Sequence, residues 1–187
     1  MMMQMLAAGG VPIFTDGQRV ADENNPKGYY EVDLTKSITK RNSWVHDCNG
    51  KAVKVVAPLI KHLPSSVDYR VINMRRPIEE ILRSQTKMLE RLEKNSSNMS
   101  DEQLSRVLRD DMNSAVNLLN IHQHPVLSLN YADVIAAPSK AAAAIKEFLD
   151  MDLDEPAMSK AVEPGLHREK KQSAGPTEEG AGGTDSR

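Results

Sequence analysis

Two consecutive arginines, Arg75 and Arg76, stand where a predicted strand ends and a predicted helix begins. The strand covers residues 69–74, YRVINM, whose β-branched and apolar side chains favour a buried position. Pro77 follows, and proline is well suited to the first turn of a helix. The carboxyl end of a parallel strand is where α/β proteins place ligands, and a helix N-terminus adds free N–H groups and a favourable dipole. The chemistry indicated is the binding of an anion such as phosphate.

The arginine pair has two interpretations. In the first, one guanidinium forms a planar fork on a phosphate, and Ser84, about two turns into the helix, donates from its hydroxyl. In the second, the arginines pair with Glu79 and Glu80, one turn along, as a solvated network on the surface. A pair of arginines at a strand end suggests an anion site and is not diagnostic of one, so both interpretations stay open at this point.

The elements that must position these side chains are strands alternating with helices. β-branched runs, apolar periodicity and capping residues locate them along the chain. The predicted strands cover residues 51–57, 69–74 and 126–129, and the predicted helices cover residues 1–8, 34–46, 58–63, 77–92, 100–120 and 139–150. Ser100 and Gln103 have the spacing of a capping box. This alternation predicts an α/β fold with a parallel sheet.

Composition limits the function classes. The chain has 187 residues, 24 basic and 26 acidic side chains and a net charge of -2, so no global positive field is available for nucleic acid or an anionic membrane. The single cysteine, Cys48, cannot form an internal disulfide, and no run approaches the ~20 apolar residues of a membrane span. We expect one domain over residues 1–168, a disordered tail over residues 169–187 and a cytoplasmic location.

Four segments carry a longer pattern. In residues 5–31 a helix runs into a Gly-rich turn and then the sequence NNPKGYYE. The Arg-Arg-Pro at the strand end leads into a helix that bears Ser84. Residues 126–149 contain a strand, the turn LNYAD and a helix that ends in FL, and residues 162–168 read VEPGLHR. Together these segments resemble the bacterial branch of the sulfotransferase family.

The resemblance implies a fold and a reaction. The fold would be a three-layer α/β/α arrangement with a mostly parallel sheet, of the P-loop NTPase-like sulfotransferase type. The reaction would move a sulfuryl group from 3′-phosphoadenosine 5′-phosphosulfate to a hydroxyl or amine of a small-molecule, glycan or peptide acceptor. Arg75 and Ser84 match the residues that hold the donor's 3′-phosphate, and Arg76 is the alternative to Arg75, because Ser84 follows Arg75 by nine positions and Arg76 by eight. Arg168 in the closing segment is a further donor-binding candidate.

One part of the family pattern is absent from the sequence. Family members begin with a strand and a Pro-Arg-Ser-Gly-Thr-Ser-like loop that holds the donor's 5′-phosphosulfate, whereas this sequence opens inside the first helix. Gly9 and Gly10 lie at the other end of that helix and lack a basic partner. We therefore expect an N-terminally truncated fold, weak donor binding and an exposed sheet edge that favours self-association. The alternative function is a non-catalytic sulfotransferase-like protein that has lost the 5′-phosphosulfate site.

Two basic side chains are candidates for the catalytic groups. Lys54 lies on a predicted strand where cytosolic family members carry Lys-Thr-His, so it matches their lysine, although valine replaces their histidine. His62 is a candidate base, with an ordinary surface histidine as the alternative. Three acidic residues of the acceptor-side segment are alternative bases: Asp22, Glu23 and Glu31.

No metal site is expected. Residues 150–154 have the acidic spacing of a calcium loop, but Glu155 stands where glycine is required. His122, His124 and Cys48 lack the spacing typical of zinc ligands, and isolated histidines near a strand are more often structural.

Overall fold

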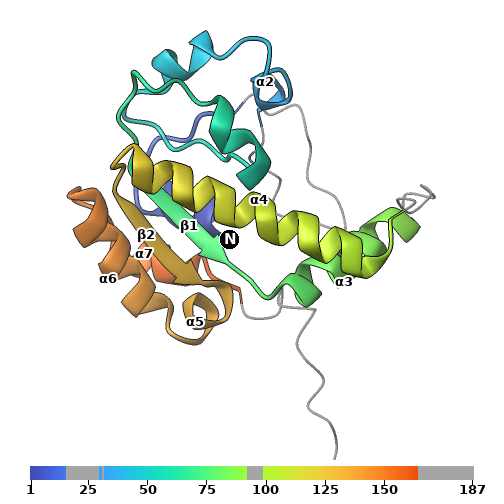
Figure 1. Cartoon of the computed structure of the whole chain (residues 1–187). Coiled ribbons are helices and arrows are strands. Elements are labelled where there is room, and N and C mark those ends of the chain that lie inside the picture. Colours follow the sequence, from blue (N-terminus) through green and yellow to red (C-terminus); the bar gives the residue numbers. More distant parts are fainter. Residues whose placement is uncertain (16–29, 31, 92–98, 164–187) are drawn as a thin grey trace, which may run out of the picture.

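The structure of the chain is a computed structural model that describes residues 1–15, 30, 32–91 and 99–163 (Figure 1). At its centre β1 (Val71–Arg75) pairs in parallel with β2 (Val126–Asn130). The register joins Val71 to Val126 and runs without a break to Arg75 and Asn130. Two of the three predicted strands are therefore confirmed, with bounds that differ by one or two residues.

Helices make up most of the described chain. Their bounds are α1 Met2–Ala8, α2 Asp33–Lys36, α3 Ile78–Arg91, α4 Asp101–Ile121, α5 Tyr131–Ala136, α6 Pro138–Leu149 and α7 Glu155–Lys160, with two 3-10 helices, η1 Ser43–Cys48 and η2 Ala57–His62. In Figure 1, α4 crosses in front of the strands, and α5 and α6 lie beside β2. The described residues are thus mixed α/β, mostly helical, with one two-stranded parallel sheet. Among them, no helix is both long and apolar enough to cross a membrane.

The alternation of side chains along the strands divides the sheet into two faces. The apolar side chains of one face pack against the main hydrophobic core: Ile72, Met74, Leu127 and Leu129. The opposite face carries Asn73, whose Nδ2 donates to Oγ of Ser128 at 3.4 Å. The register explains both sets, because residues paired across neighbouring strands point to the same face.

The main core joins the N-terminal helix to the C-terminal helices. Met5 of α1, Ile145 of α6 and Met158 of α7 are completely buried in it. The predicted helix over residues 1–8 is confirmed as α1, and its buried methionine fills space between helices, as flexible thioether side chains commonly do.

The helix that leads into β2 begins as the sequence predicts. The N–H of Gln103 donates to Oγ of Ser100 at 3.3 Å, and the N–H of Ser100 donates to Oε1 of Gln103 at 3.0 Å. This reciprocal pair confirms the capping box at the start of α4.

A second, smaller core lies beside the segment that precedes β1. Its buried members are Ile38, Trp44, Val45 and Cys48. The Phe14 ring stacks on Trp44, with ring centroids 5.8 Å apart. This contact attaches the segment that follows α1 to η1.

The predicted helix over residues 34–46 is wrong, because only α2 and η1 form there. The hydroxyls of Thr35 and Ser37 donate to carbonyl oxygens three residues earlier, at 2.6 and 3.0 Å. Local side-chain bonds of this kind offer the backbone an alternative to a continuous helix.

Residues 51–57 do not form the predicted strand. A single parallel bridge joins Ala52 to Ile13, where the N–H of Ala52 donates to the carbonyl of Pro12 at 2.8 Å. Pro12 has no N–H, and η2 begins at Ala57, so the pairing does not extend into a ladder. The larger sheet of the predicted three-layer fold is therefore not seen in the described residues.

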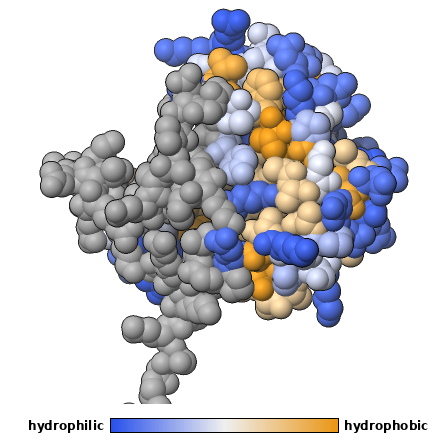
Figure 2. All heavy atoms as spheres, turned by 180° about the vertical axis from the view of Figure 1, so that it is seen from behind, coloured by the Kyte–Doolittle hydropathy of each residue, from blue (hydrophilic) through white to orange (hydrophobic). Residues whose placement is uncertain are grey.

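Some apolar side chains remain on the surface. Figure 2 shows apolar residues among hydrophilic ones on the back of the molecule. Of the described large apolar side chains, Ile121 and Val56 are the most exposed, at 74% and 52%. Self-association through an exposed sheet edge stays a prediction.

The close approach of α1 to α7 gives a test of the main core. A Cβ atom on Gly9 would lie 2.7 Å from Cγ and 2.8 Å from Sδ of the buried Met158. We expect Gly9→Ala to lower the free energy of unfolding by about 1–3 kcal/mol, the usual cost of overpacking, as measured by chemical denaturation. In a Met158→Ala background the same substitution should cost much less, and an undiminished cost there would contradict this packing.

Candidate anion-binding site

The carboxyl ends of β1 and β2 lie side by side. Arg75 and Asn130 are the last register partners of the sheet. From there β1 turns through Arg76 and Pro77 into α3, and β2 leads directly into α5 at Tyr131. The pairing therefore brings two segments, 55 positions apart in the sequence, to one end of the sheet.

A cavity of about 610 Å³ opens at this end, and we call it the Arg75 cavity. Three stretches of chain line it: the turn into α3, the middle of α4, and the turn from β2 into α5. The lining residues are Arg75, Arg76, Pro77, Ile78, Glu79, Arg109, Met112, Asn113, Asn130, Tyr131, Ala132 and Asp133. Its volume lies within the range of sites for small ligands.

The Arg76 side chain contacts two other side chains of the protein. Its Nε lies 2.9 Å from Oε2 of Glu80, one turn along α3. Its guanidinium carbon lies 4.9 Å from the centroid of the Tyr131 ring, a cation–π contact. Glu80 is a buried acid, with 8% of its surface exposed. Arg76 thus pairs with a glutamate, as the second interpretation of the arginine pair predicts.

The ion pair also affects Tyr131. Burial raises the pKa of the Tyr131 phenol, the Arg76 charge lowers it, and the Glu80 charge raises it. Burial has the largest effect, so the net change raises the pKa of the phenol above its ordinary value.

Arg75 and Arg109 make no such contacts with the described residues. Both are exposed, and neither has a hydrogen-bond or ion-pair partner among the described residues. Close by, Nδ2 of Asn130 donates to Oδ2 of Asp133 at 2.8 Å, which orients the amide at the end of β2. Two guanidinium groups that line the cavity can thus bind an anion without breaking a contact to another described residue.

The other predicted site residues lie elsewhere. Ser84 is exposed on α3 and is not among the residues that line the Arg75 cavity. Lys54 and His62 are half-buried and do not line it either, and the carbonyl of His62 accepts from Nδ2 of Asn42 at 3.0 Å. Four further candidates lie outside the described residues: Asp22, Glu23, Glu31 and Arg168. So does the predicted tail over residues 169–187.

Sequence reasoning overlooked the contribution of α4. Arg109, Met112 and Asn113 follow the helical spacing of one face, and this spacing was the available signal. A spacing does not say which element the face covers, so the sequence did not link these residues to the arginine pair.

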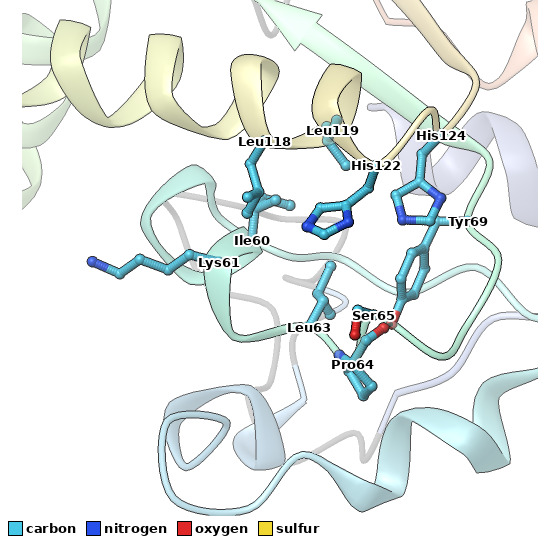
Figure 3. A pocket seen from close by; sticks show the side chains of 10 residues that line it. All are labelled: Ile60, Lys61, Leu63, Pro64, Ser65, Tyr69, Leu118, Leu119, His122 and His124. Carbon is cyan, nitrogen blue, oxygen red and sulfur yellow. Dashed lines mark hydrogen bonds between the residues drawn. The ribbon is translucent and has the colours of Figure 1, made fainter.

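A second cavity, of about 270 Å³, lies at the amino ends of the strands (Figure 3). We call it the histidine cavity. Its lining residues are Ile60, Lys61, Leu63, Pro64, Ser65, Tyr69, Leu118, Leu119, His122 and His124. The Tyr69 hydroxyl donates to the carbonyl of Pro64 at 2.8 Å, and the Tyr69 ring meets His124 edge-on at 5.0 Å.

The acidic stretch after α6 serves helix capping and pairing. Oδ1 of Asp154 accepts from the N–H of Ala157 at 2.9 Å and caps α7. Asp152 and Glu155 both contact Nζ of Lys146, at 3.4 and 3.3 Å. In the part of the chain that the structure describes, no group of three or more His, Cys, Asp or Glu side chains is close enough to hold a metal ion.

Comparison with known proteins finds no matching family model, no matching curated protein and no matching solved structure. The class of protein is therefore defined by geometry alone: a mixed α/β chain with a cation-lined cavity at the carboxyl end of a parallel strand pair. The resemblance to sulfotransferases is a hypothesis to be tested through that cavity.

The phenol of Tyr69 gives a test of the packing around the histidine cavity. Burial, with a smaller effect of Cys48, raises the pKa of Tyr69 to about 12. Since the unfolded value is about 10, the unfolded state ionises first, and stability should fall as the pH rises from about 10 to about 12. Urea denaturation across this range should show a shallower fall for Tyr69→Phe. Identical slopes for the two proteins would contradict the raised pKa.

Proposed function

We propose that the protein is a sulfotransferase-like protein whose Arg75 cavity binds the 3′-phosphoadenosine part of the sulfuryl donor. The observation that carries this proposal is that Arg75, at the carboxyl end of β1, is exposed and has no hydrogen-bond or ion-pair partner among the described residues. It is the same residue that the sequence resemblance matches to the 3′-phosphate site. Two independent lines of argument thus meet at one side chain.

Electrostatics supports an anion as the ligand. Three arginines line the cavity, against the two carboxylates of Glu79 and Asp133. Because Arg76 is paired with Glu80, Arg75 and Arg109 are the arginines of the described cavity lining that a ligand could engage. The first turn of α3 lies at the same wall, and a helix N-terminus favours negative charge by roughly 0.3–1 kcal/mol.

Sulfuryl transfer also needs a proton acceptor. An oxygen or nitrogen of the acceptor forms a new bond to sulfur, the bond from sulfur to the bridging phosphate oxygen breaks, and the acceptor's proton passes to a base. Glu79 and Asp133 line the cavity, whereas His62 does not. In this proposal one of these carboxylates takes the proton, and 3′,5′-bisphosphoadenosine leaves.

A second candidate function is binding without transfer. In the described residues β1 continues into Arg76 and Pro77, and β2 into Tyr131, so neither strand is followed by a glycine-rich loop. The described glycines are Gly9, Gly10 and Gly50, and none lines the Arg75 cavity. A loop that would hold the phosphosulfate is therefore not among the described elements, which favours a protein that recognises the nucleotide end alone.

Calorimetry with 3′,5′-bisphosphoadenosine tests the site. We expect detectable binding that Arg75→Gln weakens by roughly tenfold or more, since a hydrogen bond to a charged group is worth about 1.5–3 kcal/mol. Arg106→Gln is the matched control, because Arg106 is an exposed arginine of α4 outside the cavity lining. Equal affinities for wild type and Arg75→Gln, or no binding by either, would refute the proposal.

An assay of donor turnover separates the two candidate functions. The protein is incubated with 3′-phosphoadenosine 5′-phosphosulfate and a panel of phenols and amines, and the release of 3′,5′-bisphosphoadenosine is measured. A sulfotransferase should release 3′,5′-bisphosphoadenosine in a way that depends on the acceptor and does not depend on magnesium. The Arg75→Gln variant should release it more slowly than wild type. Binding without release would select the non-catalytic function.

A further inference from the structure

The histidine cavity combines an apolar interior with a few polar groups. Its walls include five apolar side chains, contributed by η2, the turn that follows it and the end of α4: Ile60, Leu63, Pro64, Leu118 and Leu119. Its polar side chains are Lys61, Ser65, Tyr69, His122 and His124. Apolar walls with a few convergent polar groups are the usual composition of a site for a small organic molecule.

The end of α4 places the two histidines together. The N–H of His124 donates to the carbonyl of Leu119 at 3.0 Å, and the N–H of Gln123 donates to the carbonyl of Asn120, also at 3.0 Å. This is the Schellman pattern, and Gln123 takes the left-handed conformation it requires, with φ of 57°. The sharp turn sends both imidazoles toward the cavity, with ring centroids 6.0 Å apart (Figure 3).

The imidazoles have hydrogen-bonding groups to offer. Among the described residues, no hydrogen bond joins the imidazole ring of His122 or of His124 to another group. The Tyr69 hydroxyl, by contrast, already donates to the carbonyl of Pro64. The polar atoms left for a ligand are therefore those of the two rings and the hydroxyl of the exposed Ser65.

The charge of the cavity selects the sign of the ligand. None of its described lining residues carries a carboxylate, whereas Lys61 is cationic and each imidazole has a ring N–H that can donate to an anion. The Lys61 side chain extends away from the histidines in Figure 3, so its charge acts on a ligand from a distance, without a direct contact. An anionic group is favoured here and a cationic group is disfavoured.

We propose that the histidine cavity is a binding site for a small aryl carboxylate. The ring lies against the apolar walls, and the carboxylate accepts hydrogen bonds from His122 and His124. A volume of about 270 Å³ suits a ligand with a single ring. The site is separate from the Arg75 cavity, because Tyr69 and His124 precede β1 and β2 whereas Arg75 and Asn130 end them. It therefore does not depend on the proposed function.

Three probes with the same ring and different charges test the site. Phenylacetate, phenylacetamide and phenethylamine are titrated into the labelled full-length chain, and imidazole resonances are followed by NMR. Phenylacetate should shift the resonances of His122 and His124 and bind at least tenfold more tightly than phenethylamine, as expected for hydrogen bonds to a charged group. Equal or tighter binding of phenethylamine, or unshifted imidazole resonances, would overturn the proposal.

Variants locate the binding. His122→Gln and His124→Gln should each weaken phenylacetate several-fold, whereas His46→Gln, which changes an exposed histidine of η1 outside the lining, should leave it unchanged. Ser65→Asp adds a carboxylate at an exposed position and should reverse the preference toward phenethylamine. An unchanged preference in Ser65→Asp, or equal effects of the three histidine substitutions, would contradict the assigned place.

Discussion

The parallel pairing of β1 with β2 is the contact on which both cavities depend. Its register places Arg75 next to Asn130 at one end of the strands. At the other end, the segments just before the strands bring the rings of Tyr69 and His124 together, with their centroids 5.0 Å apart. A slip of one residue would turn Ile72 and Met74 away from the main core and exchange the two faces of the sheet. Burial of that apolar face therefore maintains the geometry of both ends.

The adjacent arginines that line the Arg75 cavity have different roles: one stabilises the fold, and the other is available to a ligand. Arg76 pairs with the buried Glu80 and lies over the Tyr131 ring, so it ties the start of α3 to the start of α5. A ligand that bound the Arg76 guanidinium would have to compete with the Glu80 carboxylate of this partly buried pair, so Arg76 is less suited than Arg75 to reversible binding. Arg75, the last residue of β1, is exposed and has no hydrogen-bond or ion-pair partner among the described residues. Of the two adjacent arginines, Arg76 therefore stabilises the fold, and Arg75 is available to a ligand.

Prediction from the sequence succeeded where the signal is local. β-branched runs located β1 and β2, and Ser100 with Gln103 marked the start of α4, because a capping box depends on residues within one turn. It failed over residues 51–57, where the residues suit a strand but the structure offers one bridge to Ile13 in place of a neighbouring strand. Strand formation needs a partner, and a partner is not a property of the segment itself.

For the candidate site, the sequence by itself determined that arginines stand between a strand and a helix, a consequence of local periodicity and of Pro77. Only the tertiary structure decided which arginine pairs with other described residues, because Glu80 and Tyr131 reach Arg76 through helix geometry and strand pairing. The tertiary structure likewise brought Arg109 to the Arg75 cavity and gathered His122, His124 and Tyr69 at the opposite end. These groups come from distant parts of the chain, and packing of the two strands against their helices is what brings them within contact distance.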